Sequence, residues 1–267
     1  MKYLLQERIG VGGMGEVFRT ADGFAVKRLL PHLASDARFL DLFLAEVRVC
    51  AQLQHPNIVR IIDFGEVGGS WALVMELVDG VDLREVPKLP PGCVAQLGAS
   101  AASALHHAHT ARDRHGRALK VLHRDVSPHN VLVSRHGEVK LIDFGIARAT
   151  EGLPGKWAYL SPEVAEGGEA TPRSDQFSLG VLLWERLTGK RLFKGVSDAV
   201  TLQKVVACEV PLPKVAKGLD DVVMRALAKA PDERWPDCGA FCRALDDARM
   251  EFTGGGGADE LVAAVFV

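Results

Sequence analysis

The chain has 267 residues, of which 48% are hydrophobic and 25% are charged, a composition typical of a soluble protein with one large domain or two small lobes. Its formal net charge of -2 at pH 7 excludes a global basic field that would attract nucleic acid or anionic lipid. Any bound anion must therefore be held by a local group of residues, and we expect no nucleic-acid or membrane partner.

The cysteines and the N-terminus indicate the compartment. Five cysteines are scattered along the chain without a CxxC pair or a histidine at a zinc-ligand interval, so we interpret them as small apolar side chains under reducing conditions. The N-terminal stretch MKYLLQERIG is too short and too charged for a signal sequence. No run reaches the ~18 apolar residues of a membrane span. The sequence therefore predicts a cytoplasmic protein.

The first eighty residues are predicted to be rich in strands. Short apolar segments are separated by glycines and by the turn-forming pair Asp22-Gly23. The pair Ser35-Asp36 can cap a helix that runs to about residue 53 and carries its apolar residues on one stripe. The predicted strands cover residues 3–9, 16–20, 24–30, 58–64 and 71–78.

After Asp79-Gly80 the pattern changes from strands to helices, beginning with an alanine-rich helix at residues 94–110. The other predicted elements are short strands at residues 121–122, 131–133 and 139–142 and helices at residues 175–188, 197–206, 219–230 and 236–250. A β-rich lobe therefore precedes a helical lobe, with the boundary near residues 77–80. The glycines at 254–257 predict a flexible break, and the apolar tail after them is compatible with a docked strand or a docked helix.

A glycine-rich segment between the first two predicted strands fits the pattern GxGxxGxV. Its residues are Gly10, Val11, Gly12, Gly13, Met14, Gly15, Glu16 and Val17. Residues without a side chain allow backbone N–H groups to close over phosphate oxygens, although glycines also serve ordinary turns. In a dinucleotide-binding unit the motif would open a helix, whereas here it continues into a strand.

Lys27 lies on the third predicted strand, where a lysine is commonly a solvated charge. Glu46 lies in the middle of the first predicted helix, near its apolar stripe. A carboxylate in that place would hold Lys27 in one rotamer, aimed at phosphate and not at solvent. We therefore expect an ion pair between these two residues.

Three polar residues follow in the second lobe. Asn130 comes five residues after Asp125, and Asp143 comes directly after the strand at residues 139–142. Asn130 and Asp143 supply oxygen ligands that suit Mg²⁺, a cation that takes few protein ligands and binds phosphate oxygens as well. Asp125 is then a carboxylate that can orient a hydroxyl nucleophile and accept its proton.

Taken together, these motifs resemble the catalytic domain of protein kinases, above all the eukaryotic-like Ser/Thr kinases of bacteria. The likeness covers nearly all of the chain and adds the segments HRD at 123–125, DFG at 143–145 and SPE at 161–163. It implies an α+β, two-lobed protein-kinase fold. The implied divisions are a kinase domain at 1–250, with N-lobe 1–77, hinge 76–80 and C-lobe 81–250, and a glycine-rich linker and apolar tail at 251–267.

The resemblance also implies the activity, which is transfer of the γ-phosphate of ATP to Ser or Thr hydroxyls of protein substrates, autophosphorylation included, in signalling. Mg²⁺ is the expected ion, with Mn²⁺ as an alternative. By the same likeness Asp175 anchors the catalytic-loop backbone, and Glu163 pairs with Arg234. The adenine is expected against Ile9, Val17, Ala25, Leu132 and the gatekeeper Met75, and against the backbone of Glu76 and Val78.

Two positions depart from the family pattern. Ser127 stands two residues after Asp125, where Ser/Thr kinases usually have lysine, and Lys156 stands where they usually have threonine. In the family these positions face each other, so we hypothesise an exchange in which Lys156 offsets charge on the transferred phosphoryl group and Ser127 bonds Asp125. The alternative is a degraded position 127 and a solvated Lys156. Thr150 is the expected phosphorylation site if Arg124 binds a loop phosphate.

Two other functions remain open at this point. A nucleotide-binding pseudokinase or scaffold would explain Ser127 and the short segment at 143–163, but the residues expected to bind phosphate and metal are intact. A small-molecule phosphotransferase is disfavoured, because the SPE segment and Asp175 are typical of kinases that act on proteins. We expect a separate regulatory partner protein to deliver any signal.

Overall fold

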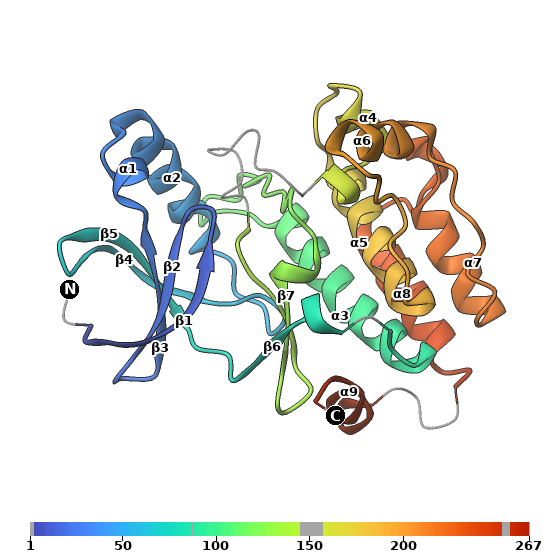
Figure 1. The fold of residues 1–267 in the computed structure, drawn as a ribbon, viewed down its shortest axis with the longest axis horizontal. Coiled ribbons are helices and arrows are strands. Elements are labelled where there is room, and N and C mark those ends of the chain that lie inside the picture. The colour runs from blue at the N-terminus through green and yellow to red at the C-terminus, as the bar shows by residue number, and fades with distance from the viewer. Residues whose placement is uncertain (1–2, 87, 145–156, 253–256, 267) are drawn as a thin grey trace.

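The computed structural model of the protein describes residues 3–86, 88–144, 157–252 and 257–266. A β-rich lobe formed by the first part of the chain packs beside a larger helical lobe (Figure 1). The predicted two-lobed α+β fold is confirmed, and the chain passes from one lobe to the other after β5.

The N-terminal lobe is built on a five-stranded antiparallel sheet with the strand order β1-β2-β3-β5-β4. All five strands were predicted, within about three residues at each end. Gly23 forms the turn between β2 and β3 with a φ of 80°, a conformation that favours glycine. The strands are β1 (Leu5–Gly12), β2 (Gly15–Thr20), β3 (Phe24–Leu29), β4 (Ile61–Val67) and β5 (Ser70–Glu76).

Helix α2 (Ala37–Cys50) follows the short helix α1 (Pro31–Ala34) and packs on this sheet. The Asp36 side chain accepts hydrogen bonds from the backbone N–H groups of Arg38 and Phe39, so the predicted N-cap is confirmed. The buried stripe of α2 consists of Phe39, Phe43, Val47 and Cys50. Most of this stripe packs with residues of β3 and β5, which places the face of α2 that carries Glu46 close to the inner side of the sheet.

A smaller sheet lies where the two lobes meet, with the order β6 (Gly80–Asp82), β7 (Val131–Ser134), β8 (Val139–Leu141). Gly80 is required here, because a Cβ at this position would lie 2.2 Å from the carbonyl oxygen of Val133. The strand predicted at residues 121–122 was wrong. This segment joins neither of the two sheets that the described residues form, since Lys120 turns the chain with a φ of 53° just before it.

The C-terminal lobe is a bundle of helices around α3 and α5. A Cβ at Gly98 of α3 would lie 2.8 Å from Leu183 of α5, so glycine permits this close packing. Helix α5 is buried along almost its whole length and therefore shows no single apolar stripe. The helices are α3 (Pro91–Thr110), α4 (Pro162–Ala165), α5 (Pro172–Thr188), α6 (Asp198–Ala207), α7 (Lys217–Ala226) and α8 (Cys238–Arg249), with 3-10 turns η1 (Leu83–Glu85), η2 (Pro128–Asn130), η4 (Trp157–Tyr159) and η5 (Pro231–Glu233).

The apolar tail forms helix α9 (Ala258–Val265), which packs on α3 and β7 (Figure 1). Of the two forms that the sequence left open, the helix is therefore correct. Leu261 is fully buried in the main core of the C-terminal lobe. The turn before β8 meets the start of α9 closely, because a Cβ on Gly137 would lie 2.6 Å from Ala258.

In the part of the chain that the structure describes, none of the helices is both long enough and apolar enough to cross a bilayer.

Because Leu261 is fully buried, we expect Leu261→Ala to lower the free energy of unfolding by about 2–5 kcal/mol. The measurement is urea denaturation followed by circular dichroism. Ala263→Ser changes an exposed position of the same helix and is expected to change stability by less than about 0.5 kcal/mol. Equal stabilities of the two variants would contradict the docking of α9.

Candidate active site

The glycine-rich segment forms the tip of the β1–β2 hairpin. Gly12 pairs with Gly15 across the turn, and a Cβ on Gly15 would lie 2.2 Å from the carbonyl oxygen of Arg28. Gly15 is therefore required by the packing of β2 against β3. The Met14 side chain is buried in the N-terminal core, and its carbonyl oxygen accepts a hydrogen bond from Leu30. Only the backbone of Met14 is thus left for the predicted contact with a nucleotide.

Glu16 of β2 belongs to a cluster of charges that also includes Arg8 of β1 and Arg28 of β3. Its carboxylate bonds Arg8 at 2.7 Å and Arg28 at 3.0 Å. Hydrogen bonds from Arg8 and then from Arg28 lower the pKa of Glu16. The side chain of Glu16 therefore links β2 to β1 and β3. Only the backbone of Glu16 is left for a contact with the nucleotide.

Four of the side chains predicted to hold the adenine come from adjacent strands of the larger sheet, namely Ile9, Val17, Ala25 and Met75. Ala25 of β3 is paired with Met75 of β5, and both are buried. In the hairpin, Gly10 is paired with Val17. Ile9 and Val11 are exposed on β1, and Leu132 comes from β7 in the smaller sheet. Strand β5 ends at Glu76, whose carboxylate accepts a hydrogen bond from Lys140 Nζ at 2.9 Å. Val78, in the segment after β5, is half-buried.

Lys27 is buried on β3, and its Nζ lies 2.6 Å from Oδ2 of Asp143. Glu46 of α2 lies 4.0 Å from Arg124. The predicted ion pair between Lys27 and Glu46 is not among the pairs within 4.0 Å that the described residues form. Lys27 instead donates a charge-assisted hydrogen bond to the Asp143 carboxylate, and the Glu46 carboxylate lies close to Arg124.

The catalytic-loop residues Asp125 and Asn130 are held together by hydrogen bonds. Asn130 Nδ2 donates to the backbone oxygen of Asp125 at 2.8 Å and to its Oδ2 at 2.5 Å. The backbone N–H of Ile142 donates a hydrogen bond to the backbone carbonyl oxygen of Asn130 at 3.1 Å. This bond places Asp143, the next residue, beside Asn130, so the structure brings together the polar residues that the sequence predicted.

These residues fit a magnesium ion by the chemistry of their donors. Asp143 offers a carboxylate, and Asn130 uses its amide nitrogen to bond Asp125, which leaves its amide oxygen as the acceptor. Carboxylate and amide oxygens are ligands that Mg²⁺ accepts, and the ion needs few of them when phosphate oxygens complete its shell.

The backbone of the catalytic loop is fixed by Asp175 of α5, as the family likeness implied. Its carboxylate accepts from the N–H of His123 at 2.8 Å and from that of Arg124 at 2.7 Å. Arg124 has a φ of 64° and Asp143 a φ of 62°. A non-glycine residue in this left-handed region costs about 1–3 kcal/mol, and the hydrogen bonds to Asp175 offset that cost at Arg124.

Asp175 is also bonded to His109 of α3, with 2.8 Å between Nε2 and Oδ2. Burial alone would raise the pKa of Asp175, but the hydrogen bond and charge of His109 and the interactions of His123 lower it. Burial lowers the pKa of His123, so its neutral ring can accept the N–H of Asp125 at Nδ1. Asp175 is therefore an ionised anchor at neutral pH.

The role of His109 was missed in the sequence. Three histidines near the end of the alanine-rich helix favoured a solvated or packed role. The signal was present in the spacing, because His109 follows the buried residues Leu105 and Ala102 at helical intervals on the face toward α5.

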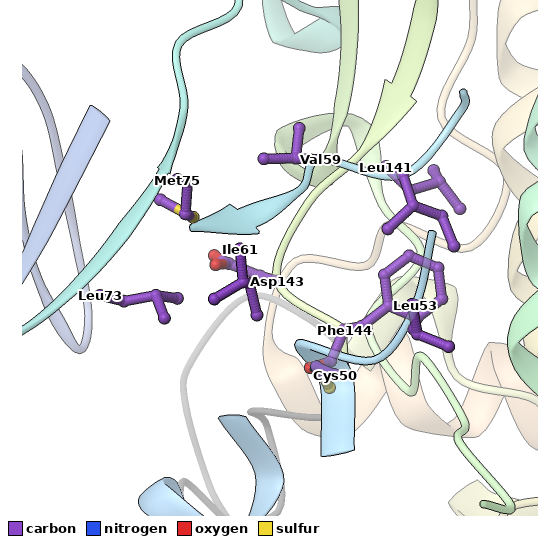
Figure 2. A pocket seen from close by; sticks show the side chains of 10 residues that line it. Cys50, Leu53, Val59, Ile61, Leu73, Met75, Leu141, Asp143 and Phe144 are labelled. Atoms are coloured by element: carbon purple, nitrogen blue, oxygen red, sulfur yellow. Dashed lines mark hydrogen bonds between the residues drawn. The ribbon is translucent and has the colours of Figure 1, made fainter. Parts of the chain in front are cut away.

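A small cavity of about 20 Å³ lies behind Met75, between α2, the sheet and Phe144 (Figure 2). Its walls are apolar except for Cys50 and Asp143. The Phe144 ring packs on the ring of His123 with 4.5 Å between centroids. The segment that carries Asp143 thus lies between α2 and the catalytic loop.

Ser127 is buried, and its Oγ has no hydrogen-bond partner among the described residues. The predicted bond from Ser127 to Asp125 is therefore not formed in this structure. Lys156, Thr150 and Gly145 lie outside the described residues, so the exchange between positions 127 and 156 and the phosphorylation of Thr150 stay predictions.

Glu163 and Arg234 form the buried ion pair that the likeness implied. Arg234 donates to the two carboxylate oxygens at 2.9 and 2.7 Å and is almost fully buried. Desolvation would raise the pKa of Glu163, but the hydrogen bonds and charge of Arg234, with the backbone N–H of Glu163, lower it to about 2. The pair joins α4, which contains Glu163, to the segment between η5 and α8, which contains Arg234.

The comparisons with known proteins agree with this geometry. A family model described as "Protein kinase domain" matches residues 3–243. The chain is 36% identical to Tyrosine-protein kinase MasK of Myxococcus xanthus, over 98% of this chain and 45% of that protein. It is 40% identical to Serine/threonine-protein kinase PknB of Mycolicibacterium smegmatis, over 88% of this chain and 41% of that protein. The chain thus spans less than half the length of these two relatives.

Among solved structures, the chain is similar to the kinase domain of Mycobacterium tuberculosis PknI. The two share 31% sequence identity with a TM-score of 0.68, over 92% of this chain and 96% of that one.

The lowered pKa of Glu163 predicts a pH dependence of stability. Because the pKa falls from 4.5 to about 2 on folding, the ionised carboxylate of Glu163 stabilises the folded protein at pH values above 4.5. This contribution is lost as the pH falls from 4.5 toward 2, when the folded state must take up the proton.

We therefore expect Glu163→Gln to lower the free energy of unfolding at pH 7, with a smaller difference from the wild type at pH 3. The measurement is urea denaturation at both pH values. Glu169→Gln removes an exposed carboxylate of the same region and serves as the control. A Glu163→Gln effect that is the same at both pH values would contradict the assignment.

Proposed function

The chain belongs to the protein kinase domain family, and from this premise we propose that it is an active kinase that transfers the γ-phosphate of Mg·ATP to Ser or Thr hydroxyls of proteins. The observation that carries the proposal is the convergence of Lys27, Asp143, Asn130 and Asp125 at the junction of the lobes. An intact set of this kind argues against a pseudokinase, the alternative that Ser127 had suggested.

Each residue has a role that follows from its chemistry. Lys27 binds the phosphates of ATP once Asp143 releases it, and Glu46 then becomes its partner. Asn130 and Asp143 would hold the magnesium ion, which would offset the charge on the phosphates. Mn²⁺ satisfies the same oxygen ligands. Asp125, oriented by its bonds from Asn130, positions the acceptor hydroxyl and takes its proton.

The nucleotide is proposed to lie between the lobes, with its phosphates under the glycine hairpin. Ile9, Val17, Ala25 and Leu132 would sandwich the adenine ring beside Met75, and the backbone of Glu76 and Val78 would bond its edge. The backbone N–H groups of Gly10, Gly12 and Gly13 would face the phosphates. The register of β1, β2, β3 and β5 supports this proposal.

The names of the two relatives give different acceptor residues. PknB is named a Ser/Thr kinase and MasK a tyrosine kinase. The segments HPNIVRIIDFG at 55–65, LVMELVDG at 73–80 and YLSPE at 159–163 resemble those of the Ser/Thr kinases of bacteria, which supports Ser and Thr as acceptors. Protein substrates are proposed on the same basis. The five cysteines are free thiols, which supports the cytoplasm as the place of action.

We expect Asp125→Asn to lower the rate of phosphoryl transfer at least about 100-fold, because the general base is lost, and Lys27→Met to act similarly through phosphate binding. The measurement is autophosphorylation and phosphorylation of a generic protein substrate with labelled ATP, followed by phospho-amino-acid analysis.

Lys190→Met, at an exposed lysine away from the site, is the matched control for Lys27→Met and should keep the wild-type rate. Full activity of Asp125→Asn would refute the proposed role of that residue. Labelled phosphotyrosine alone would refute Ser/Thr specificity.

The proposed exchange between positions 127 and 156 makes a separate prediction. Lys156→Thr should lower the transfer rate roughly 100-fold, as removal of one charge-stabilising group does, and Ser127→Lys in the same chain should restore a large part of it. Kinetics of the two single variants and the double variant measure this coupling. If Lys156→Thr keeps full activity, the exchange is wrong.

A further inference from the structure

Helix α9 contacts the turn between β7 and β8, residues 135–138, at two places. At the start of the helix, Ala258 lies so close to Gly137 that a Cβ on this glycine would be 2.6 Å away. Just after the helix, the Phe266 ring lies against the guanidinium group of Arg135, with 5.1 Å between Cζ and the ring centroid. Figure 1 shows α9 near the turn that follows β7.

Arg135 also holds the segment that connects the two lobes. Its backbone N–H donates a hydrogen bond to the carbonyl oxygen of Asp79 at 2.9 Å, and its Nε lies 3.5 Å from Oδ1 of the same residue. The next residue, Gly80, is paired with Ser134 of β7. Arg135 therefore joins the end of the hinge at residues 76–80 to the sheet of the second lobe.

The hinge and β7 form two sides of the proposed adenine site. The backbone of Glu76 and Val78 is proposed to bond the edge of the ring, and Leu132 of β7 is proposed to cover one face of it. Leu132 is paired with Asp82 of β6, just beyond the hinge. A shift of Asp79 relative to β7 would therefore change the distance between the two sides of the site.

The contact with Phe266 decides how firmly Arg135 holds Asp79. The side chains of Arg135 and Asp79 are 62% and 71% exposed, so their ion pair alone contributes little. The Phe266 ring is half-buried and packs against the main core of the C-terminal lobe. A guanidinium group held over such a ring is restricted to fewer positions and gains a cation–π contact.

We propose that Arg135 is a positioning residue for the nucleotide, and that α9 holds it in place through Phe266. The effect on the nucleotide rests on the proposed function, because it acts through the adenine site between the hinge and β7. The competing explanation is that Phe266 only buries apolar surface. The two explanations differ in whether the aromatic ring matters to the hinge.

Three substitutions separate these explanations. Phe266→Leu keeps a large apolar side chain and removes the ring, whereas Phe266→Tyr keeps the ring. Arg135→Ala removes the guanidinium group that the ring contacts. Apolar packing alone predicts that none of the three changes the hinge. The positioning role predicts that Phe266→Leu and Arg135→Ala loosen it and that Phe266→Tyr does not.

The first measurement is amide hydrogen exchange at residues 76–82 in the protein without nucleotide. We expect exchange about threefold faster in Phe266→Leu and Arg135→Ala, the effect of one exposed cation–π contact, and near the wild-type rate in Phe266→Tyr. The second is the Kd of ADP by isothermal titration calorimetry, which should rise by about the same factor in the same two variants. The KM for ATP should rise with it, while kcat stays unchanged.

Arg117→Ala is the matched control, since Arg117 is an exposed arginine that is paired with Asp113 at 2.9 Å. It should change neither the exchange at residues 76–82 nor the Kd of ADP. Wild-type exchange in Phe266→Leu and Arg135→Ala, or equal acceleration in Phe266→Tyr, overturns the proposal, as does an unchanged Kd of ADP. A wild-type chain that binds ADP without phosphoryl transfer refutes the proposed function instead, and the exchange and the Kd still decide the role of Arg135.

Discussion

The buried carboxylate of Asp175 is the constraint on which the candidate site depends. Taking a carboxylate out of water is costly unless its oxygens are fully hydrogen-bonded, and here two backbone N–H groups and His109 satisfy them. In return, the carboxylate holds Arg124 in a left-handed conformation and so fixes the direction of Asp125. Helices α3 and α5 thereby determine the geometry of a loop that has little regular structure of its own.

The N-terminal lobe meets this fixed loop through a small number of polar contacts. Lys27 pairs with Asp143, Glu46 faces Arg124, and Cys50 bonds the Phe144 carbonyl. If the proposed function holds, the pair between Lys27 and Asp143 must open before phosphoryl transfer, because the two side chains cannot serve phosphate and metal while they neutralise each other. In the proposed mechanism, nucleotide binding would supply the charges that separate Lys27 from Asp143.

Much of the fold could be predicted from the sequence because local signals and tertiary packing agree. The apolar stripe and the Asp36 cap predicted α2, and the glycine turns predicted the strands of the larger sheet. The order of the motifs also predicted which polar residues meet. The strand at residues 121–122 failed because a short apolar run cannot show whether a neighbouring strand is in place.

The partners of individual charges were not predictable in the same way. Lys27 had two candidate carboxylates, and the choice between Glu46 and Asp143 depends on the position of α2, which no local pattern encodes. His109 looked like an ordinary packed side chain, since its role comes from the Asp175 carboxylate, which lies far away in the sequence. The tail had an apolar pattern too short to distinguish a helix from a strand.

The most direct test of this account is a crystal structure of the chain with Mg²⁺ and a non-hydrolysable ATP analogue. The account predicts that the pair between Lys27 and Asp143 opens, that Lys27 contacts the phosphates, and that Asp143 and Asn130 bind the metal. A structure in which the pair stays closed under saturating analogue, or in which the ion avoids both residues, would contradict it.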